Sequence, residues 1–292
     1  MMRTIPHLVR TCNFPFAERM LTVDVSPLLK SFASRPGLGT LDELRACCSK
    51  LAEDNVIDTV VEIDNSERCR RKIFKKHIRG YTRQAKDSRG SAVLGYLFGI
   101  ERAKTRYLLH FDSDILLYQR PGSSWVAQGI SLLDQNPDVM CVLPLSGPPS
   151  ADGTLDQSEP YQHDPRGIFK FKSFTSRKYL IDVERFCELL PVDALWRSFT
   201  KRVREYLTNK SGLTTWERMV SGKLRKSGYI RADIDSPDAW TLHSRDRGEL
   251  FCRYLPDIIA AVERGEYPAE NAGKYDLNLK AYINLVEAKK RG

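Results

Sequence analysis

The stretch YLLHFDSDILL, residues 107–117, places two carboxylates in the middle of an apolar run. The residues before Asp112 are typical of a buried strand, and apolar residues resume directly after Asp114. In an open α/β sheet, ligands bind outside the carboxyl ends of the strands, so side chains placed just after a strand face the crevice. The two aspartates are therefore candidates for a binding site at the end of this strand.

Strand and helix patterns alternate before this stretch. Apolar residues at helical spacing open the chain at residues 5–12, and short apolar runs that end at Asp24 and Asp64 indicate two strands. A helical pattern follows Gly90 and leads into the apolar run at 107–111. This order predicts an α/β fold with a mostly parallel central sheet flanked by helices.

The composition narrows the classes of function. The chain has 292 residues, 41% of them hydrophobic, and a formal net charge of +9, which favours an anionic partner. It has no apolar run of about 18 residues, no signal-peptide pattern and no C-x-x-C spacing among its seven cysteines. These features predict a cytoplasmic protein with reduced thiols. Its basic clusters are compatible with peripheral contact with an acidic membrane surface.

The triplet Asp112, Ser113, Asp114 suits a divalent metal ion. If the chain leaves the strand in a tight bend, both carboxylates turn toward one point and form an oxygen site for Mg²⁺ or Mn²⁺. An ion held there can bridge the two phosphates of a nucleotide. The alternative is that the aspartates only cap a turn, because D-x-D triplets arise by chance and Asp favours turns.

The longer stretch RGSAVLGYLFGIERAKTRYLLHFDSDILL, residues 89–117, resembles the region of GT-A fold glycosyltransferases that leads into their D-x-D motif. Gly90, Gly99 and Ile100 stand where those enzymes have a glycine-started helix and a Gly-Ile pair. The resemblance is closest to the large inverting group that uses nucleotide-sugar donors. It departs from that group at residues 96–97, where Tyr-Leu replaces a frequent Arg-Asn pair.

This resemblance implies a GT-A (Rossmann-like) domain over residues 1–250 and a helical C-terminal extension over 251–292. It implies transfer of a sugar from a UDP- or GDP-type donor to a carbohydrate or lipid-linked acceptor, with inversion. It also implies that the family's first strand is missing. The chain opens on the helix at 5–12, so the run that ends at Asp24 corresponds to the family's second strand.

The resemblance also implies the roles of individual residues. Asp112, Asp114 and His243 would hold Mn²⁺ or Mg²⁺, and Glu217, near the start of a helix predicted at 214–227, would be the catalytic base that deprotonates the acceptor. The donor would contact Asp24, Asp64, Gly90, Ser113, Arg245 and Arg247.

Each of these residues also has a plainer interpretation. Glu217 would stabilise the start of its helix through the helix dipole, although its register with Gly228 favours the catalytic role. A lone histidine such as His243 is often structural. Arg245 and Arg247 would form a solvated basic loop if they do not bind phosphate.

Two other functions remain open from the sequence. A basic nucleic-acid-binding protein would use its charge on phosphates and its acidic motif for structure, but no nucleic-acid-binding module is recognisable, so we expect no nucleic acid partner. A nucleotidyltransferase would also place carboxylates around Mg²⁺, but no glycine-rich phosphate loop follows a first strand. The residues do not fix the sugar, the base or the acceptor.

Overall fold

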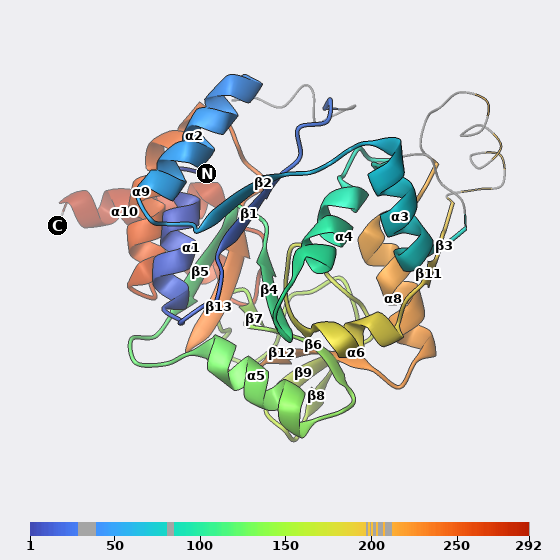
Figure 1. The fold of residues 1–292 in the computed structure, drawn as a ribbon. Coiled ribbons are helices and arrows are strands. Elements are labelled where there is room, and N and C mark those ends of the chain that lie inside the picture. The colour runs from blue at the N-terminus through green and yellow to red at the C-terminus, as the bar shows by residue number, and fades with distance from the viewer. Residues whose placement is uncertain are drawn as a thin grey trace.

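The computed structural model describes residues 1–28, 39–80, 85–196, 198, 200, 203, 207 and 212–291. Its strands run through the middle of the molecule. The helices α1, α2, α9 and α10 gather on one side of them, and α3, α4, α6 and α8 gather on the other (Figure 1). The α/β class expected from the sequence is confirmed.

The N-terminal part alternates helices with short strands, as expected. α1 (Thr4–Cys12) leads to β1 (Met20–Val23), α2 (Leu41–Glu53) and β2 (Thr59–Glu62). β1 and β2 pair in parallel, and α2 crosses over between them. α3 (Glu67–His77), β3 (Ile78–Arg79) and α4 (Val93–Arg102) follow. The basic run at 68–76 thus lies on a helix, whose last turn contains Lys75 and Lys76.

The stretch at 107–117 forms two strands with the D-S-D triplet between them. They are β4 (Tyr107–Phe111) and β5 (Ile115–Gln119). β4 lies at the edge of a six-stranded sheet with the order β4-β10-β6-β12-β9-β8, whereas β5 belongs to a three-stranded sheet with the order β5-β13-β7. The triplet is therefore the turn at which the chain passes from one sheet to the other.

The other strands and helices come from the second half of the chain. The strands are β6 (Val139–Leu143), β7 (Leu145–Ser146), β8 (Tyr161–Asp164), β9 (Ile168–Phe171), β10 (Lys178–Asp182), β11 (Val192–Asp193), β12 (Ile230–Ile234) and β13 (Ala239–His243). The helices are α5 (Trp125–Gln135), α6 (Val183–Glu188), α8 (Trp216–Lys226), α9 (Glu249–Glu263), the short 3₁₀ helix η2 (Ala269–Asn271) and α10 (Leu279–Arg291). No described helix is both long enough and apolar enough to cross a membrane.

The expectation of a mostly parallel sheet is wrong for the described strands. In the six-stranded sheet β12 pairs with β6 in parallel, but β10 runs antiparallel to both β4 and β6, and β9 runs antiparallel to both β12 and β8. Antiparallel neighbours need no helical crossover between them. The alternation of elements along the chain therefore does not reveal that β10 inserts between β4 and β6.

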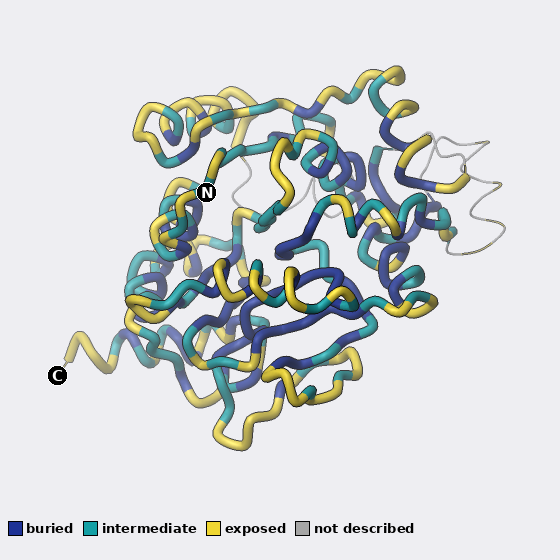
Figure 2. The backbone as a smooth tube through the Cα atoms, turned by 60° about the horizontal axis from the view of Figure 1, so that its bottom comes forward, coloured by how far each residue is buried: buried dark blue, intermediate teal, exposed yellow. Residues whose placement is uncertain are grey.

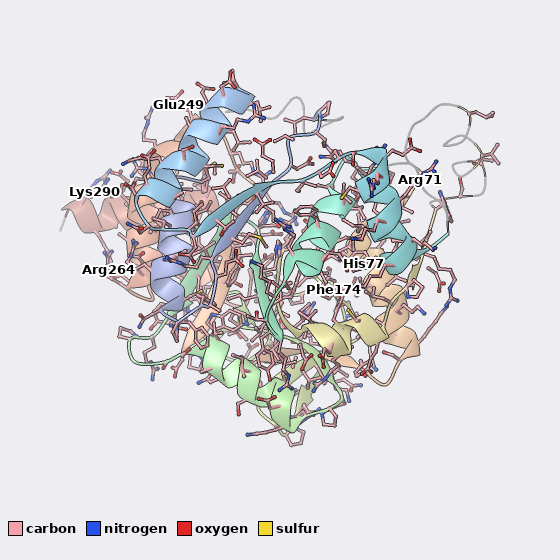
Figure 3. All side chains as sticks on the ribbon, viewed as in Figure 1. Arg71, His77, Phe174, Glu249, Arg264 and Lys290 are labelled. Atoms are coloured by element: carbon pink, nitrogen blue, oxygen red, sulfur yellow. The ribbon has the colours of Figure 1, made fainter. Side chains whose placement is uncertain are left out.

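The helices cover the sheets through apolar faces. α1 and α9 pack on β5, and α5 and α6 pack on β6 and β10. Buried backbone fills the centre of the molecule, while exposed segments lie at its periphery (Figure 2). Figure 3 shows Glu249, Arg264 and Lys290 at the outer edge formed by α9 and α10, and places His77 and Phe174 toward the interior.

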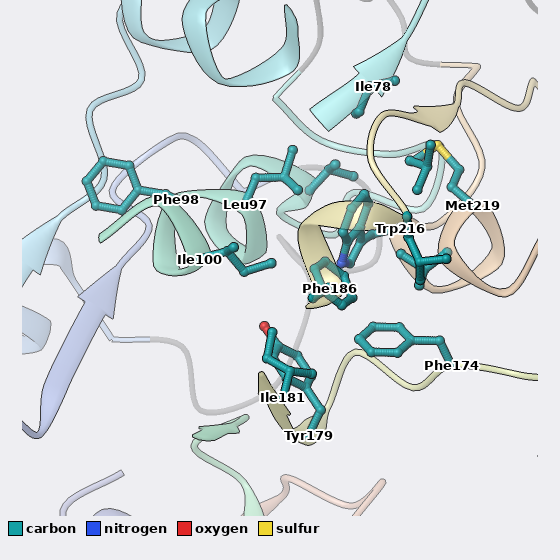
Figure 4. Close-up of a cluster of buried hydrophobic side chains, with 14 of the residues drawn as sticks. Ile78, Leu97, Phe98, Ile100, Phe174, Tyr179, Ile181, Phe186, Trp216 and Met219 are labelled. Atoms are coloured by element: carbon teal, nitrogen blue, oxygen red, sulfur yellow. The ribbon is translucent and has the colours of Figure 1, made fainter. Parts of the chain in front are cut away.

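One apolar cluster fixes the start of α8. Trp216, the first residue of that helix, is 1% exposed, and its ring lies near Phe186 of α6, with 6.4 Å between the ring centroids (Figure 4). Phe174 and Tyr179 belong to the same cluster. Because large aromatic side chains bury much area in a close-packed core, this contact sets where the next residue, Glu217, lies.

A buried histidine connects α1 to β5 and α9. The Leu117 N–H donates to His7 Nε2 over 3.0 Å, and His7 Nδ1 lies 2.8 Å from the carboxylate of Glu263. Burial lowers the pKa of His7. A neutral imidazole that donates at Nδ1 and accepts at Nε2 satisfies both partners.

Replacing His7 by Phe should reduce the free energy of unfolding by about 2–3 kcal/mol, because it keeps a ring but leaves the buried Leu117 N–H without an acceptor. Urea denaturation of both proteins measures this loss. His163→Phe is the matched control: His163 is 61% exposed and pairs with Asp235, so its loss should cost less than about 1 kcal/mol. Equal effects of the two substitutions would contradict the assigned role of His7.

Candidate active site

The D-S-D turn is positioned by one neighbouring strand on each side. β10 pairs with β4 so that the Asp112 N–H donates to the Arg177 carbonyl over 2.7 Å. β13 pairs with β5 so that His243 lies opposite Ile115. Residues far apart in the sequence therefore meet at the turn because the register of two sheets places them there.

Asp114 is held by two neighbours. Its Oδ2 lies 3.6 Å from His243 Nε2 and accepts a hydrogen bond from Arg247. Burial works to raise the pKa of Asp114, but His243 and Arg247 outweigh it and hold the pKa below its usual value. Its Oδ1 is buried and has no hydrogen-bond partner among the described residues. Asp114 is thus ionised at neutral pH, with one oxygen available to a ligand.

His243 is oriented by residues that follow η2. Its Nδ1 lies 3.4 Å from the carboxylate of Asp276, and its ring stacks on Tyr275 with 5.9 Å between centroids. Its Nε2 faces Asp114 and is contacted by Arg177. A histidine whose Nδ1–H donates to a carboxylate while Nε2 faces a second carboxylate has the arrangement of a metal-ligating histidine.

Asp112 stands apart from this pair. Its Oδ1 lies 3.3 Å from His110 Nε2, on the same strand end. Across the parts of the chain that the structure describes, no three His, Cys, Asp or Glu side chains form a group that holds a metal ion. The structure therefore brings together Asp114 and His243 of the expected ligands, and leaves the Asp112 carboxylate on His110. Ser113 is exposed at the tip of the turn.

The two arginines that follow β13 lie differently. Arg247 contacts Asp114 directly, and its side chain is 31% exposed. Arg245 is 78% exposed and pairs with Asp276 at the rim. Arg247 is therefore next to the candidate metal ligands, whereas Arg245 reaches the site only through Asp276.

Glu217 lies in the first turn of α8. The side chain of Thr215 caps that helix by accepting from the Arg218 N–H over 3.3 Å. Burial raises the pKa of Glu217, and a hydrogen bond with Thr175 and the positive charge of Arg177 oppose that rise. A partly desolvated carboxylate with a raised pKa is suited to accept a proton.

The segment 175–177 connects Glu217 with the turn. Thr175 and the Ser176 backbone bond to Glu217, and the Arg177 carbonyl accepts from the Asp112 N–H. Tyr96 of α4 packs beside the same segment. Burial, followed by the charge of Asp112, raises the pKa of its hydroxyl, and a hydrogen bond with Ser176 opposes the rise. The charges of Asp112 and Glu217 both act on Tyr96, so Tyr96 lies near the acidic turn and near Glu217.

Asp24 and Asp64 follow β1 and β2. The Asp24 carboxylate lies 3.6 Å from Lys86 Nζ, and Asn65 donates to it over 3.4 Å. Asp64 instead accepts the Ser66 N–H over 2.8 Å, a bond that lowers its pKa and forms the turn before α3.

Gly90 has a structural reason to be glycine. Its φ is +95°, a region that side chains rarely adopt. It closes a turn in which the Gly90 N–H donates to the Asp87 carbonyl over 3.0 Å and the Asp87 side chain accepts from the Arg89 N–H over 2.7 Å. The turn precedes α4, as the sequence predicts.

The chain segments before β1 and before β4 contact each other. Glu18, just before β1, pairs with Lys104, just before β4, over 3.6 Å. The starts of the two strands therefore lie near each other. The Asp24 carboxylate itself is engaged by Lys86.

Several residues of the site were not expected from the sequence. Neither Arg177 nor Lys86 belongs to a recognisable sequence motif. Tyr275 and Asp276 fall in the part predicted to be a helical extension, and only the bridge between His243 and Asp276 brings them to the site.

Comparisons of the chain with protein-family models, with curated proteins and with solved structures found no match.

Proposed function

We propose that the chain is a metal-dependent glycosyltransferase of GT-A type, which moves a sugar from a nucleotide-diphosphate donor to an acceptor hydroxyl with inversion. The observation that carries the proposal is that the D-S-D turn, His243 and Glu217 all have a neighbour in the short segment 175–177. Residues 175–177 contact both the turn and Glu217. Inverting transfer needs these two functions, a site for the leaving diphosphate and a base for the acceptor, side by side.

Asp114 and His243 offer donor atoms of the kinds that a divalent cation takes. Asp114 presents a buried carboxylate oxygen with no partner among the described residues, and His243 Nε2 lies 3.6 Å from the other oxygen of the same group. Oxygen and imidazole donors suit Mn²⁺ or Mg²⁺. Asp114 and His243 would hold the ion, with Asp112 as the further ligand, and the ion would neutralise charge on the departing diphosphate.

The positive side chains around the turn would bind the diphosphate of the donor. Arg247 neutralises Asp114 in the structure, and Arg177 contacts His243. A guanidinium presents a planar fork that matches phosphate oxygens. These two arginines would bind the diphosphate when the donor enters, and Arg245 would extend the same positive rim.

Glu217 would act on the acceptor. Its carboxylate must be ionised to take the proton of the acceptor hydroxyl as that oxygen attacks the anomeric carbon. Thr175 and the Ser176 backbone fix the carboxylate, and Arg177 favours the ionised form. Asp24, with Lys86 beside it, would face the nucleoside part of a UDP- or GDP-type donor, and the acceptor would be a carbohydrate or lipid-linked hydroxyl compound.

Thermal unfolding with nucleoside diphosphates tests the proposal. We expect UDP or GDP at about 100 times its dissociation constant to stabilise the protein by about 2.7 kcal/mol in the presence of Mn²⁺. The stabilisation should disappear when the metal is chelated. ADP and CDP serve as controls for base preference. A shift that is the same with and without Mn²⁺ would contradict the proposed metal site.

Product analysis separates this function from nucleotidyl transfer. A glycosyltransferase releases a nucleoside diphosphate from its donor, whereas a nucleotidyltransferase releases pyrophosphate from a nucleoside triphosphate. Pyrophosphate release from UTP or GTP in the presence of a sugar phosphate would overturn the proposal in favour of the nucleotidyltransferase.

A further inference from the structure

The segment 272–277, which follows η2, is attached to the end of β13. The His243 N–H donates to the Tyr275 carbonyl over 3.0 Å, and the Leu277 N–H donates to the His243 carbonyl over 3.0 Å. The two bonds form a parallel bridge between His243 and Asp276. The backbone of Tyr275 is therefore fixed relative to His243, one of the candidate metal ligands.

A second set of contacts holds the same segment. The Gly273 N–H donates to the Pro148 carbonyl over 2.7 Å, and the Asp156 N–H donates to the Gly273 carbonyl over 2.9 Å. A Cβ added to Gly147 would lie 2.5 Å from the Lys274 backbone, so the two parts of the chain are in direct contact there. The segment 272–277 is thus attached both to β13 and to the loop that follows β7.

The Tyr275 ring contacts two residues near the D-S-D turn. It stacks on His243 with an angle of 16° between the rings, and the Lys178 ammonium lies 4.6 Å from its centroid. In the register of β10 and β4, Lys178 lies opposite Phe111, the residue before Asp112. The two contacts therefore place the ring beside the turn.

The hydroxyl of Tyr275 is buried, yet it has no hydrogen-bond partner among the described residues. Such a group costs free energy, so native structures contain few of them. Burial raises the pKa of this hydroxyl well above its usual value; the positive charge of Arg177 opposes the rise, and the negative charges of Asp112 and Asp114 add to it. The hydroxyl is therefore protonated at neutral pH and lies near the charged groups of the site.

A phosphate oxygen is the acceptor that suits this hydroxyl. A protonated tyrosine donates one hydrogen bond. The carboxylates near the hydroxyl also accept hydrogen bonds, but no described carboxylate lies within hydrogen-bond distance of it. In the proposed diphosphate site, Arg177 and a divalent ion would both attract negatively charged oxygens, which would bring such an acceptor to the region of Tyr275.

We propose that the Tyr275 hydroxyl donates a hydrogen bond to an oxygen of the diphosphate that the site binds. This inference rests on the proposed diphosphate site and adds to it a neutral donor from the C-terminal part of the chain. Arg177 and the ion would supply positive charge, whereas Tyr275 would supply a directed bond from a ring whose position His243 fixes. The buried hydroxyl would then have its partner only when the ligand is bound.

Replacing Tyr275 by Phe tests the proposal, because it keeps the ring and removes only the oxygen that lacks a partner. The probe is inorganic pyrophosphate, titrated calorimetrically into the full chain in the presence of Mn²⁺. We expect the variant to bind pyrophosphate about 10–100-fold more weakly, as expected for loss of a hydrogen bond to a charged group. Its affinity for Mn²⁺ alone should be unchanged. Its unfolding temperature without ligand should not fall, because no bond within the described part of the protein is lost.

Tyr282→Phe is the matched control. Tyr282 of α10 is 0% exposed, and its hydroxyl also has no hydrogen-bond partner among the described residues. It belongs to an apolar cluster with Trp240 and Phe251, whereas Tyr275 packs against a different cluster. Tyr282→Phe should leave the affinity for pyrophosphate unchanged. Weaker binding by Tyr275→Phe alone, with no loss of stability in either variant, would indicate contact with the ligand.

Three results would overturn the proposal. Equal pyrophosphate affinity of the unaltered chain and of Tyr275→Phe would show that the hydroxyl does not contact the ligand, and the metal and diphosphate site would still stand. An equal loss of affinity for Mn²⁺ alone would mean that Tyr275 acts on the metal ligands instead. Absence of Mn²⁺-dependent pyrophosphate binding by the unaltered chain would remove the diphosphate site itself, on which the proposed function also depends.

Discussion

Replacing Asp112 and Asp114 together by Asn should reduce Mn²⁺-dependent nucleotide affinity at least about 100-fold, because loss of outer-shell partners alone costs 10–100-fold in metal sites. Asparagine keeps the size of each side chain but removes the charge. In the protein, Asp114 is held ionised by His243 and Arg247, and its Oδ1 remains without a partner among the described residues. Isothermal titration with UDP or GDP, with Mn²⁺ and with a chelator, measures the loss.

The control for this experiment is Asp134→Asn. Asp134 pairs with Arg106 at the surface and is 44% exposed, so its substitution removes a carboxylate without affecting the turn. Circular dichroism of all variants establishes that they fold. Unchanged affinity in the Asp112→Asn, Asp114→Asn protein would show that nucleotide binds elsewhere.

Replacing Glu217 by Gln should reduce turnover by ~100-fold or more while donor affinity stays unchanged, as expected for loss of a general base. Burial raises the pKa of Glu217, and the base acts only when ionised. Activity should therefore fall as the pH is lowered through a value above that of an ordinary glutamate. The Gln variant should lose this acidic limb of the kcat/KM profile.

Glu249→Gln separates catalysis from an effect on the helix start. Glu249 also occupies the first turn of a helix, α9, but its side chain is 88% exposed, and it forms its ion pair with Arg253 of the same helix. It should leave turnover unchanged. If Glu217→Gln and Glu249→Gln had equally small effects, Glu217 would be a residue that only stabilises its helix.

The local elements were predictable because their signals are local. The apolar spacing at 5–12 and the runs before Asp24 and Asp64 gave α1, β1 and β2 with nearly correct limits. The apolar run before Asp112 gave β4, and the position of Glu217 at a helix start was also predicted. Hydrophobic periodicity and helix capping depend on neighbours within a few residues, so the sequence carries them directly.

The sheet arrangement was not predictable in the same way. β10 lies between β4 and β6, although β6 precedes it in the sequence. The residues of β10 do not indicate which strands it pairs with. Arg177 and Asp276 reach the site only through that pairing and through the bridge at His243. Long-range register depends on how whole faces pack, so a single sequence without comparison does not show it.

The D-S-D turn also joins two sheets mechanically. Asp112 is attached to the end of β4, and Asp114 to the start of β5, which belongs to the other sheet. His243, the last residue of β13, belongs to the same sheet as β5 and is the third side chain at this junction. An ion bound by these side chains would therefore cross-link the two sheets. Binding of the ion would reduce the motion of one sheet relative to the other. Donor binding would therefore also make the two sheets more rigid.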